Sequence, residues 1–529
     1  MNTDTTLTLD YHQQTKHRFT GYARSPGYLD WDTQPDPFRT FGEEGLIRLP
    51  LAGLEPEARY ADLFAPGRVS PAPDNPATLG LLLRLAFGLS AWKSVPGSRW
   101  SLRCNPSSGN LHPTEAYVVA GPGQAISPGV YHYRPYDHVL ECRAEVELPL
   151  SGILIGLSSV FWREAWKYGE RAFRYCQHDV GHALGALRMA AGVLGWGVRL
   201  LDDWGDDDIA RLLGLDRTED FGQAEREAPD LLCRVGPRLN GPLGIDAIIA
   251  ALSAARWRGR ANRLSQEHRH DWPIIDTVHA ATHKPRTSPA PGRPGATTHP
   301  PITLGADTRA MDILLQRRSA QAFDGITAIP ARALFQILAA TLPGRPPCDV
   351  LPWPPRVNLV LFVHRVVGLT PGLYLFARHE GAAAALRQAM RAEFGWEPVE
   401  AADASPVLFR LVAANARTAA QRLSCHQDIA ADGAFSLGML AEFEPVLAEG
   451  AWHYRRLFWE CGLIGQALYL AAEDAGVRGT GIGCYFDDAM HELLGLSDSR
   501  YQSLYHFTVG SPVEDSRLQT LPPYGHLER

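Results

Sequence analysis

One short loop, NPSSGN at residues 105–110, contains residue types that could bind a ligand. The hydroxyl groups of Ser107 and Ser108 and the side-chain amide of Asn110 could hydrogen-bond to polar atoms of a ring or of a ribityl-type chain. Prolines flank the loop, Pro106 among them, so the alternative is a tight turn with Asn in a left-handed conformation. The loop therefore predicts either a ligand site or a turn.

Two adjacent arginines, Arg317 and Arg318, precede Ser319 at the end of an apolar helix that is expected to begin near Met311. Two guanidinium groups beside a hydroxyl can hold a phosphate group through charge-assisted hydrogen bonds. Cations also favour the negative pole of a helix dipole without any ligand. The solvated helix end is the commoner reason for this pattern, so a phosphate site needs further support.

Lys167 and Tyr168 place an amine beside a phenol, near Glu164. Burial could shift the pKa of either group and make it a general acid or base, although surface ion pairs on an amphipathic helix give this composition more often. The same segment offers a metal alternative, because His178 and His182 have the i, i+4 spacing of two ligands on one helix face. No HExxH glutamate accompanies them, so no metal site is predicted.

The composition excludes several classes of protein. The net charge of −7 argues against a sequence-independent hold on nucleic acid, and no apolar run approaches the ~20 residues that span a membrane. The N-terminal sequence has no apolar signal-peptide segment, and the dispersed cysteines form no CxxC pair, so we expect reduced thiols and a cytoplasmic location. Cys425 and His426 are adjacent, and neighbours on a strand point to opposite faces, so no Cys–His nucleophile is expected.

The 529 residues indicate two or more domains, and residues 283–303 form a proline-rich boundary near the middle. Residues 173–215 align without a gap to residues 454–496 at a constant offset of 281, with 13 of 43 positions identical. This self-similarity indicates a duplicated fold unit. Two copies of one unit in one chain would pack as a pseudo-twofold dimer.

The duplication provides a control for three alternating glycines, Gly479, Gly481 and Gly483, with Ile482 between the last two. Glycine lets the backbone approach a flat ring closely or adopt a positive φ. The aligned residues 198–203 read VRLLDD and contain no glycine. Since the fold does not require glycine there, a ligand beside the second copy is favoured.

Elements of both types recur in each unit. Apolar residues at helical spacing after a proline predict helices over 76–92 and 329–342, and β-branched runs predict strands at 115–121 and 356–363. Residues 486–496 are expected to form a short helix with an Asp cap. The expected fold is α+β, with a central mixed, mainly antiparallel sheet surrounded by helices, present twice.

Four motifs together resemble the nitroreductase superfamily of FMN oxidoreductases, and particularly its SagB-type, azoline dehydrogenase-like branch in a tandem form. The family's RRS-x-(R/K)-x-F phosphate motif is similar to residues 317–323, and its PSxxN flavin loop is similar to residues 106–110. Its glycine-containing loop beside the flavin ring resembles residues 479–483. Its Lys-Tyr pair before an RYR…GH helix, associated with dehydrogenation, resembles residues 167–182.

The resemblance implies one composite FMN site between two fused halves. Family members are usually homodimers in which one subunit supplies the arginine motif and glycine loop and the other supplies the PSxxN loop. Here the first half lacks RRS and the second lacks PSSGN, so the mirror site would be lost. Gln321 stands where the family usually has a cation, and Arg517 is expected to supply the missing charge. The implied cofactor-binding residues are Arg317, Arg318, Ser319, Gln321, Pro106, Ser107, Ser108, Asn110, Gly481, Ile482, Gly483 and Arg517, and the implied catalytic residues are Lys167 and Tyr168.

The resemblance also implies hydride transfer to flavin N5 from a small-molecule or modified-peptide substrate, alongside biosynthetic partner enzymes, with proton removal by Lys167 or Tyr168. An NAD(P)H-dependent nitro or quinone reductase is the enzymatic alternative, and a flavin-free pseudoenzyme scaffold is the alternative of another class. The intrachain pseudo-dimer would exist as a monomer or a homodimer. The expected domains are an extension (1–69) wrapping the first domain, the first domain (70–280), a linker (281–304) and the second domain (305–529).

Overall fold

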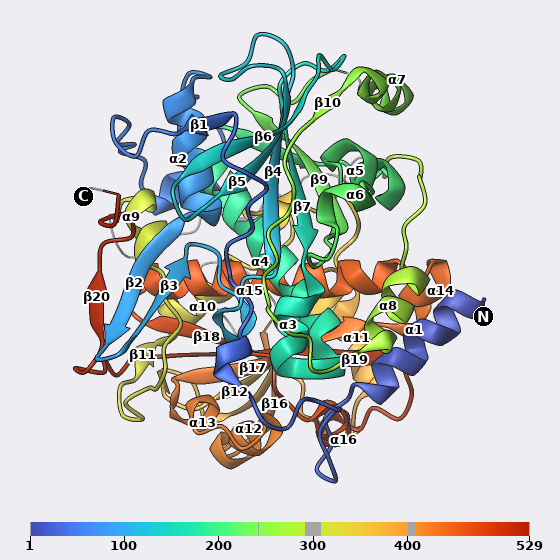
Figure 1. Ribbon diagram of the computed structural model, residues 1–529. Helices are drawn as coiled ribbons and strands as arrows, with labels where there is room; N and C mark the ends of the chain where they lie inside the picture. Colours follow the sequence, from blue (N-terminus) through green and yellow to red (C-terminus); the bar gives the residue numbers. More distant parts are fainter. Residues whose placement is uncertain (1, 242, 291–307, 400–407, 528–529) are drawn as a thin grey trace.

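The computed structural model describes residues 2–241, 243–290, 308–399 and 408–527, which form two similar α+β halves (Figure 1). Within these residues, the main sheets have the strand orders β1-β6-β5-β4-β7-β9-β8, with β10 beside β6, and β15-β16-β14-β12-β17-β19-β18. All pairings in these two sheets are antiparallel, for example β4 with β7 and β12 with β17. The α+β class is confirmed. The strands are β1 (Leu46–Arg48), β4 (Thr114–Ala120), β5 (Gly129–Arg134), β6 (Val139–Glu145), β7 (Ile153–Ser159), β8 (Gly197–Leu200), β9 (Ala228–Gly236), β10 (Arg256–Trp257), β12 (Val357–Val363), β14 (Gly372–Phe376), β15 (Glu397–Val399), β16 (Leu408–Ala413), β17 (Phe435–Glu442), β18 (Arg478–Ile482) and β19 (Tyr501–Gly510).

Helices cover the sheets on both sides, so the central strands, including all of β4 and β12, are buried. One apolar core lies between the sheets and contains residues of both halves. A separate core lies on the outer face of each sheet. The outer helices are α5 (Asp206–Leu213), α6 (Thr218–Phe221) and α7 (Ile245–Ala251) in the first half, and α11 (Ala382–Ala389), α12 (Arg417–Leu423), α13 (Ile429–Asp432) and α16 (Asp487–Leu494) in the second.

Two long helices, α4 (Ala172–Val193) and α15 (His453–Asp474), cross between the sheets at the centre of the molecule (Figure 1). Gly181 and Gly462 lie at the crossing, where a Cβ on Gly181 would come within 2.3 Å of the carbonyl oxygen of Trp459. The absence of both side chains therefore lets the backbones touch. The two halves therefore pack directly against each other through these helices.

The 281-residue offset also relates buried ion pairs across this interface. Arg174 of α4 binds Asp487 of the second half at 2.7 Å, and Arg455 of α15 binds Asp206 of the first half at 2.7 Å. Each pair joins the long helix of one half to the N-terminus of a short helix in the other, where negative charge is favourable. The halves thus hold each other through two equivalent contacts.

Three local predictions differ from the structure. The helix expected over 76–92 ends earlier, as α2 (Pro76–Phe87), because Gly88 breaks it and the chain continues as β2 (Leu89–Val95). The expected Asp cap is absent: Phe486 is the N-cap residue, and the Asp487 carboxylate binds arginines instead. Cys425 and His426 lie in a turn with positive φ, not on a strand.

The chain ends join the halves further. Strand β2 pairs with both β3 (Ser98–Arg103) and β20 (Gln519–Leu521), so the C-terminal segment lies on the first half. Helix α1 (Thr3–Gln14) packs beside α8 (Pro273–Ala281), and its Thr5 hydroxyl donates to Leu447 of the second half. The N-terminal segment therefore contacts both halves, and most of the proline-rich linker lies outside the described residues.

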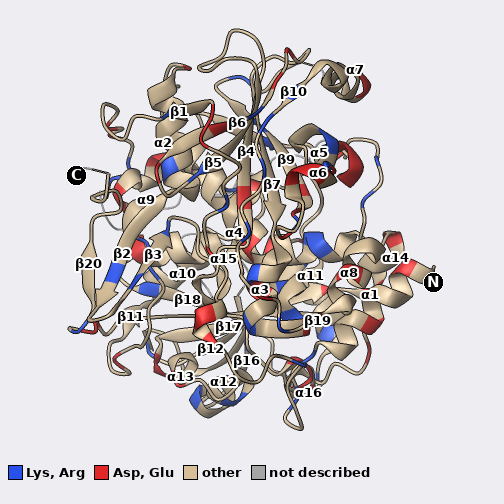
Figure 2. Ribbon diagram, in the orientation of Figure 1, with Lys and Arg blue, Asp and Glu red and all other residues tan. Residues whose placement is uncertain are grey.

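Charged residues of both signs are spread over both halves (Figure 2). In the described part of the chain, no helix has the length and apolar character needed to cross a membrane.

Candidate active site

A cavity of about 670 Å³ lies where the two halves meet. The first half contributes the loop that leads from β3 to β4, together with residues of α3 (Phe161–Tyr168) and α4. The second half contributes the segment after α9 (Ala310–Gln316), strand β18 and residues 513–520. The predicted site residues that line it are Pro106, Ser107, Ser108, Asn110, Tyr168, Arg317, Arg318, Ser319, Gln321, Gly481, Ile482 and Gly483.

The PSSGN loop is both a tight turn and a wall of this cavity. Asn110 has a φ of 60°, as expected for a left-handed turn, and its side chain donates to the carbonyl oxygen of Ser101 at 2.9 Å. The Ser107 hydroxyl accepts a hydrogen bond from the backbone N–H of His112 at 2.8 Å. The tight turn is confirmed, and internal hydrogen bonds fix the amide and hydroxyl groups of the loop at the cavity wall.

Gly109 explains why the loop needs a glycine. Its φ is 60°, and a Cβ at this position would lie 2.6 Å from Tyr168 Oη and 3.1 Å from Lys167 Nζ. The loop thus rests directly on the Lys-Tyr pair, although the two segments are distant in the sequence. Tyr168 lines the cavity, and Lys167 lies beside it with its Nζ 5.4 Å from the centre of the Tyr168 ring.

Burial shifts the pKa values of these two side chains in opposite directions. It lowers the pKa of the Lys167 amine, and it raises the pKa of the Tyr168 phenol well above its ordinary value. Both shifts favour the neutral form. At neutral pH the phenol keeps its proton, and the amine loses its proton more readily than an exposed lysine.

Asp179, on α4, fixes the PSSGN loop through hydrogen bonds. Its carboxylate accepts hydrogen bonds from the backbone N–H of Ser108 at 3.1 Å and from the Ser108 hydroxyl at 3.2 Å. Burial raises the pKa of Asp179 to about 7, against these hydrogen bonds. Among the described residues, no cationic side chain lies within 4 Å of it, so a titratable carboxyl group faces the cavity.

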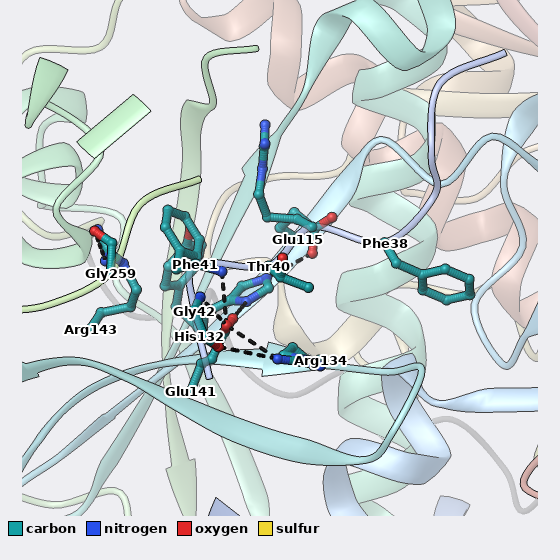
Figure 3. Close-up of polar contacts among 12 residues, drawn as sticks. Phe38, Thr40, Phe41, Gly42, Glu115, His132, Arg134, Glu141, Arg143 and Gly259 are labelled. Carbon is teal, nitrogen blue, oxygen red and sulfur yellow. Dashed lines mark hydrogen bonds and ion pairs between the residues drawn. The ribbon is translucent and has the colours of Figure 1, made fainter. Parts of the chain in front are cut away.

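A buried network holds α3 against the end of the same loop. Arg163 of α3 donates to the carbonyl oxygen of His112 at 2.7 Å and forms an ion pair with Glu115 on β4. His132 lies between Glu115 and Glu141, 2.9 Å from each (Figure 3). The two carboxylates raise the pKa of His132 to about 9 despite its burial, so it is a cation at neutral pH. This network fixes the helix that presents the Lys-Tyr pair.

The arginine pair lies across the cavity from these groups. Arg317 donates to the carbonyl oxygens of Cys104 at 2.9 Å and Arg103 at 3.0 Å, both in the first half. Arg318 donates to the carbonyl oxygen of Ser90 at 2.8 Å. Among the described residues, no carboxylate oxygen lies within 4 Å of either guanidinium. Burial and the charge of Arg317 lower the pKa of Arg318 to about 10, so an anion placed here would be stabilised.

Strand β18 carries Gly479 and Gly481, Gly483 follows it directly, and aromatic rings fill the space that side chains at these positions would take. A Cβ would come within 2.6 Å of Phe507 at Gly479, 2.0 Å of Tyr505 at Gly481 and 2.2 Å of Tyr175 at Gly483. None of the three has a positive φ. The glycines therefore have a packing reason of their own, and they let two tyrosines that line the cavity pack against the strand.

Arg517 lies apart from the other predicted residues. Its side chain is 85% exposed, pairs with Asp515 at 2.8 Å and does not line the cavity.

The histidines of the metal alternative form hydrogen bonds across the interface between the halves. His178 Nε2 lies 2.9 Å from the carbonyl oxygen of Leu504, and His182 Nε2 lies 3.1 Å from Tyr505 Oη. Within the described residues, no group of three or more His, Cys, Asp or Glu side chains could hold a metal ion.

Several cavity residues were not among the predicted site residues, because they are single residues on buried helices and strands. Asp179 could have been found from the alignment, since the 281-residue offset pairs it with Glu460, another acid. Tyr469 carries no sequence signal, yet its phenol lies 2.8 Å from Ser319 Oγ and accepts from the N–H of Gly481 at 2.9 Å. The other such lining residues include Arg103, Tyr175, His182, Gln427, Arg478, Cys484 and Tyr505.

Comparison with known proteins finds sequences and a structure that are similar to this chain. Residues 376–511 match the model of the nitroreductase family. A stretch of 148 residues is 28% identical to a provisionally assigned nitroreductase of Methanocaldococcus jannaschii and covers 25% of this chain and 70% of that protein. The crystal structure of a provisionally assigned nitroreductase from Anabaena variabilis is 22% identical, with a TM-score of 0.69 over 96% of this chain and 99% of that chain. Residues 376–511 are therefore similar to the nitroreductase family, and the whole chain has a nitroreductase-like α+β fold.

Proposed function

We propose that this chain is an FMN-dependent oxidoreductase with a single flavin site between its two halves. The cavity carries the proposal, because it brings the PSSGN loop and Tyr168 of the first half opposite Arg317 and Arg318 of the second. Its volume of about 670 Å³ lies within the range of cofactor pockets, roughly 300–1,000 Å³.

The residues present fit the parts of FMN. The buried guanidinium groups, which lack a carboxylate partner among the described residues, suit the phosphate. The hydroxyl groups of Ser107 and Ser108 and the amide of Asn110 suit the polar atoms of the ribityl chain and ring. Strand β18, with Tyr175 and Tyr505 against its glycines, offers a flat surface to a ring.

We further propose that the enzyme is a dehydrogenase. When bound, FMN supplies the hydride acceptor, and the protein supplies orientation and proton transfer. Lys167 is the better base of the adjacent pair, because burial lowers the pKa of its amine. Tyr168 retains its proton and would hold the substrate by a hydrogen bond, since burial raises its pKa. A small molecule or a modified peptide is the expected substrate class.

The test is anaerobic absorbance spectroscopy of the FMN-loaded protein. A dehydrogenase should lose its visible flavin absorbance with an oxidisable azoline-type substrate and keep it with NAD(P)H. Lys167→Met should slow the bleaching more than Tyr168→Phe does, and it should remove the rise of the rate with pH that deprotonation of the Lys167 amine produces. Rapid bleaching by NAD(P)H would instead favour the reductase, and a protein that never binds FMN would contradict both enzymatic functions.

A further inference from the structure

Two half-buried thiols, Cys425 and Cys484, lie side by side at the wall of the cavity. Cys484 follows Gly483 and lines the cavity, and Cys425 lies in the turn between α12 and α13. Each thiol shifts the pKa of the other, so the two side chains are neighbours. Segments almost sixty residues apart in the sequence thus bring two thiols together.

The backbone around the thiols keeps them together. The N–H of Phe486 donates to the carbonyl oxygen of Leu423 at 2.8 Å. The side-chain amide of Gln427 donates to the carbonyl oxygens of Ser424 at 2.8 Å and Cys484 at 3.0 Å. Two hydrogen bonds therefore join the turn to the segment of Cys484, and the third lies within the turn.

A histidine from the N-terminal segment completes the cluster. The segment is fixed because the N–H of His17 donates to the Asp487 carboxylate at 3.0 Å and the N–H of Asp487 donates to the carbonyl oxygen of His17 at 3.1 Å. His17 Nδ1 accepts from the N–H of Ala23 at 2.9 Å, so its proton lies on Nε2. The pKa values of His17 and Cys484 each respond to the other side chain, so the neutral imidazole is a neighbour of that sulfur.

The surrounding groups divide the two thiols into different roles. Hydrogen bonds from Cys425 and His17, with a contribution from Arg171, lower the pKa of Cys484 to about 5 against its burial. The same contact raises the pKa of Cys425, which keeps its proton. Arg171 binds the Asp487 carboxylate at 3.0 Å, so the net charge near the pair is small and hydrogen bonding dominates.

We propose that Cys484 and Cys425 are a peroxide-reactive thiol pair, with Cys484 as the nucleophile and Cys425 as the resolving thiol. The Cys484 thiolate attacks one oxygen of a hydroperoxide, the O–O bond breaks, and the alcohol or water leaves after taking up a proton. The sulfur of Cys425 then attacks the Cys484 sulfenic acid, releasing water and forming a disulfide. The two thiols are oxidised by two electrons, and the hydroperoxide is reduced. The pair does not depend on the flavin proposal.

Cys142 provides an internal control for this chemistry. It is also half-buried, but burial and the nearby Glu145 raise its pKa, and no thiol or histidine contact stabilises its thiolate. At neutral pH an ordinary thiol is roughly 3% thiolate, whereas the lowered pKa of Cys484 favours its thiolate. Cys484 should therefore react with peroxide at least several-fold faster than Cys142.

The experiment treats the purified full chain with hydrogen peroxide, alkylates the remaining thiols and maps them by mass spectrometry over time. Wild-type protein should lose two thiols and yield a Cys425–Cys484 linked peptide that dithiothreitol reverses. Cys425→Ser should stop at a sulfenic acid on Cys484 that dimedone traps, and Cys484→Ser should leave Cys425 reduced. His17→Asn, which keeps an acceptor for Ala23 but loses the Nε2 donor, should slow Cys484 at least several-fold.

Two results would overturn the proposal. One is oxidation of Cys142 at the same rate as Cys484 in wild-type protein, and the other is the absence of the linked peptide. Unfolding of a variant is detected in the same data, because it would expose Cys142 and the buried thiols to alkylation together.

Discussion

Each half has an acidic residue at the same position of its long helix, but only one of the two acids has a cationic partner among the described residues. Glu460 of α15 accepts from the N–H groups of Arg356 and Val357 and binds the buried Arg378 at 2.6 Å. Asp179 of α4, at the position equated by the 281-residue offset, accepts from Ser108. Each acid thus ties its helix to the backbone that leads into the central strand of its own half.

The difference lies in the counter-charge. Arg378 neutralises Glu460 within the core, whereas burial raises the pKa of Asp179 to about 7 beside the cavity. The acid of the second half is therefore part of a closed structural ion pair, and the acid of the first half is a titratable group at the cavity.

The largest effect is expected from breaking the closed pair. Glu460→Gln leaves the Arg378 guanidinium buried without its carboxylate, which should lower the free energy of unfolding by about 3–5 kcal/mol. Asp179→Asn strands no cation and should cost only about 1 kcal/mol. Urea unfolding of both variants measures the difference, and equal losses would contradict the assigned roles.

The pH dependence of stability separates the acids in another way. Between about pH 4 and pH 7 the folded state keeps a proton on Asp179 that the unfolded chain has released, so stability falls as pH rises through this window. The full contribution is at most about 4 kcal/mol. Asp230 and Asp474, whose pKa values burial also raises, act in the same direction. Asp179→Asn should therefore flatten part of the wild-type slope, and an unchanged slope would refute this titration.

The arginine pair occurs only in the second half, and removing it tests what that half contributes. Arg317→Ala should weaken FMN binding by about 2 kcal/mol, because a charge-assisted contact is lost. Arg517→Ala is the matched control, since that guanidinium is exposed and does not line the cavity. Fluorescence titration with FMN measures both, and equal effects would remove Arg317 from the site.

A smaller effect should come from the first-half loop. Gly109→Ala places a Cβ against Tyr168 and Lys167 at a positive φ, and it should cost about 1–2 kcal/mol of stability while slowing substrate oxidation. Gly123→Ala is the control, because Gly123 has a φ of 74° with no atom near its Cβ position. If both variants lose equal stability and keep equal rates, the contact with the Lys-Tyr pair has no role.

The sequence predicted the elements that depend on local pattern. The offset of 281 anticipated that α4 and α15 would have equivalent bounds, and the polar loop and the arginine pair both lie on the cavity. It could not predict Tyr469 or Tyr505 at the cavity, since a single buried residue is placed by tertiary packing alone, whereas the alignment of Asp179 with Glu460 was a usable signal. The absence of glycine from residues 198–203 also did not show that a ligand lies beside Gly481, because Gly481 makes room for the Tyr505 ring and needs no ligand for that role.

The composite site is the central claim, and the stoichiometry of FMN tests it most directly. Isothermal titration of FMN into the flavin-free protein should saturate at one FMN per chain. Two FMN molecules per chain would show that the mirror site is active, and no saturable binding would show that the cavity between the halves is not a flavin site.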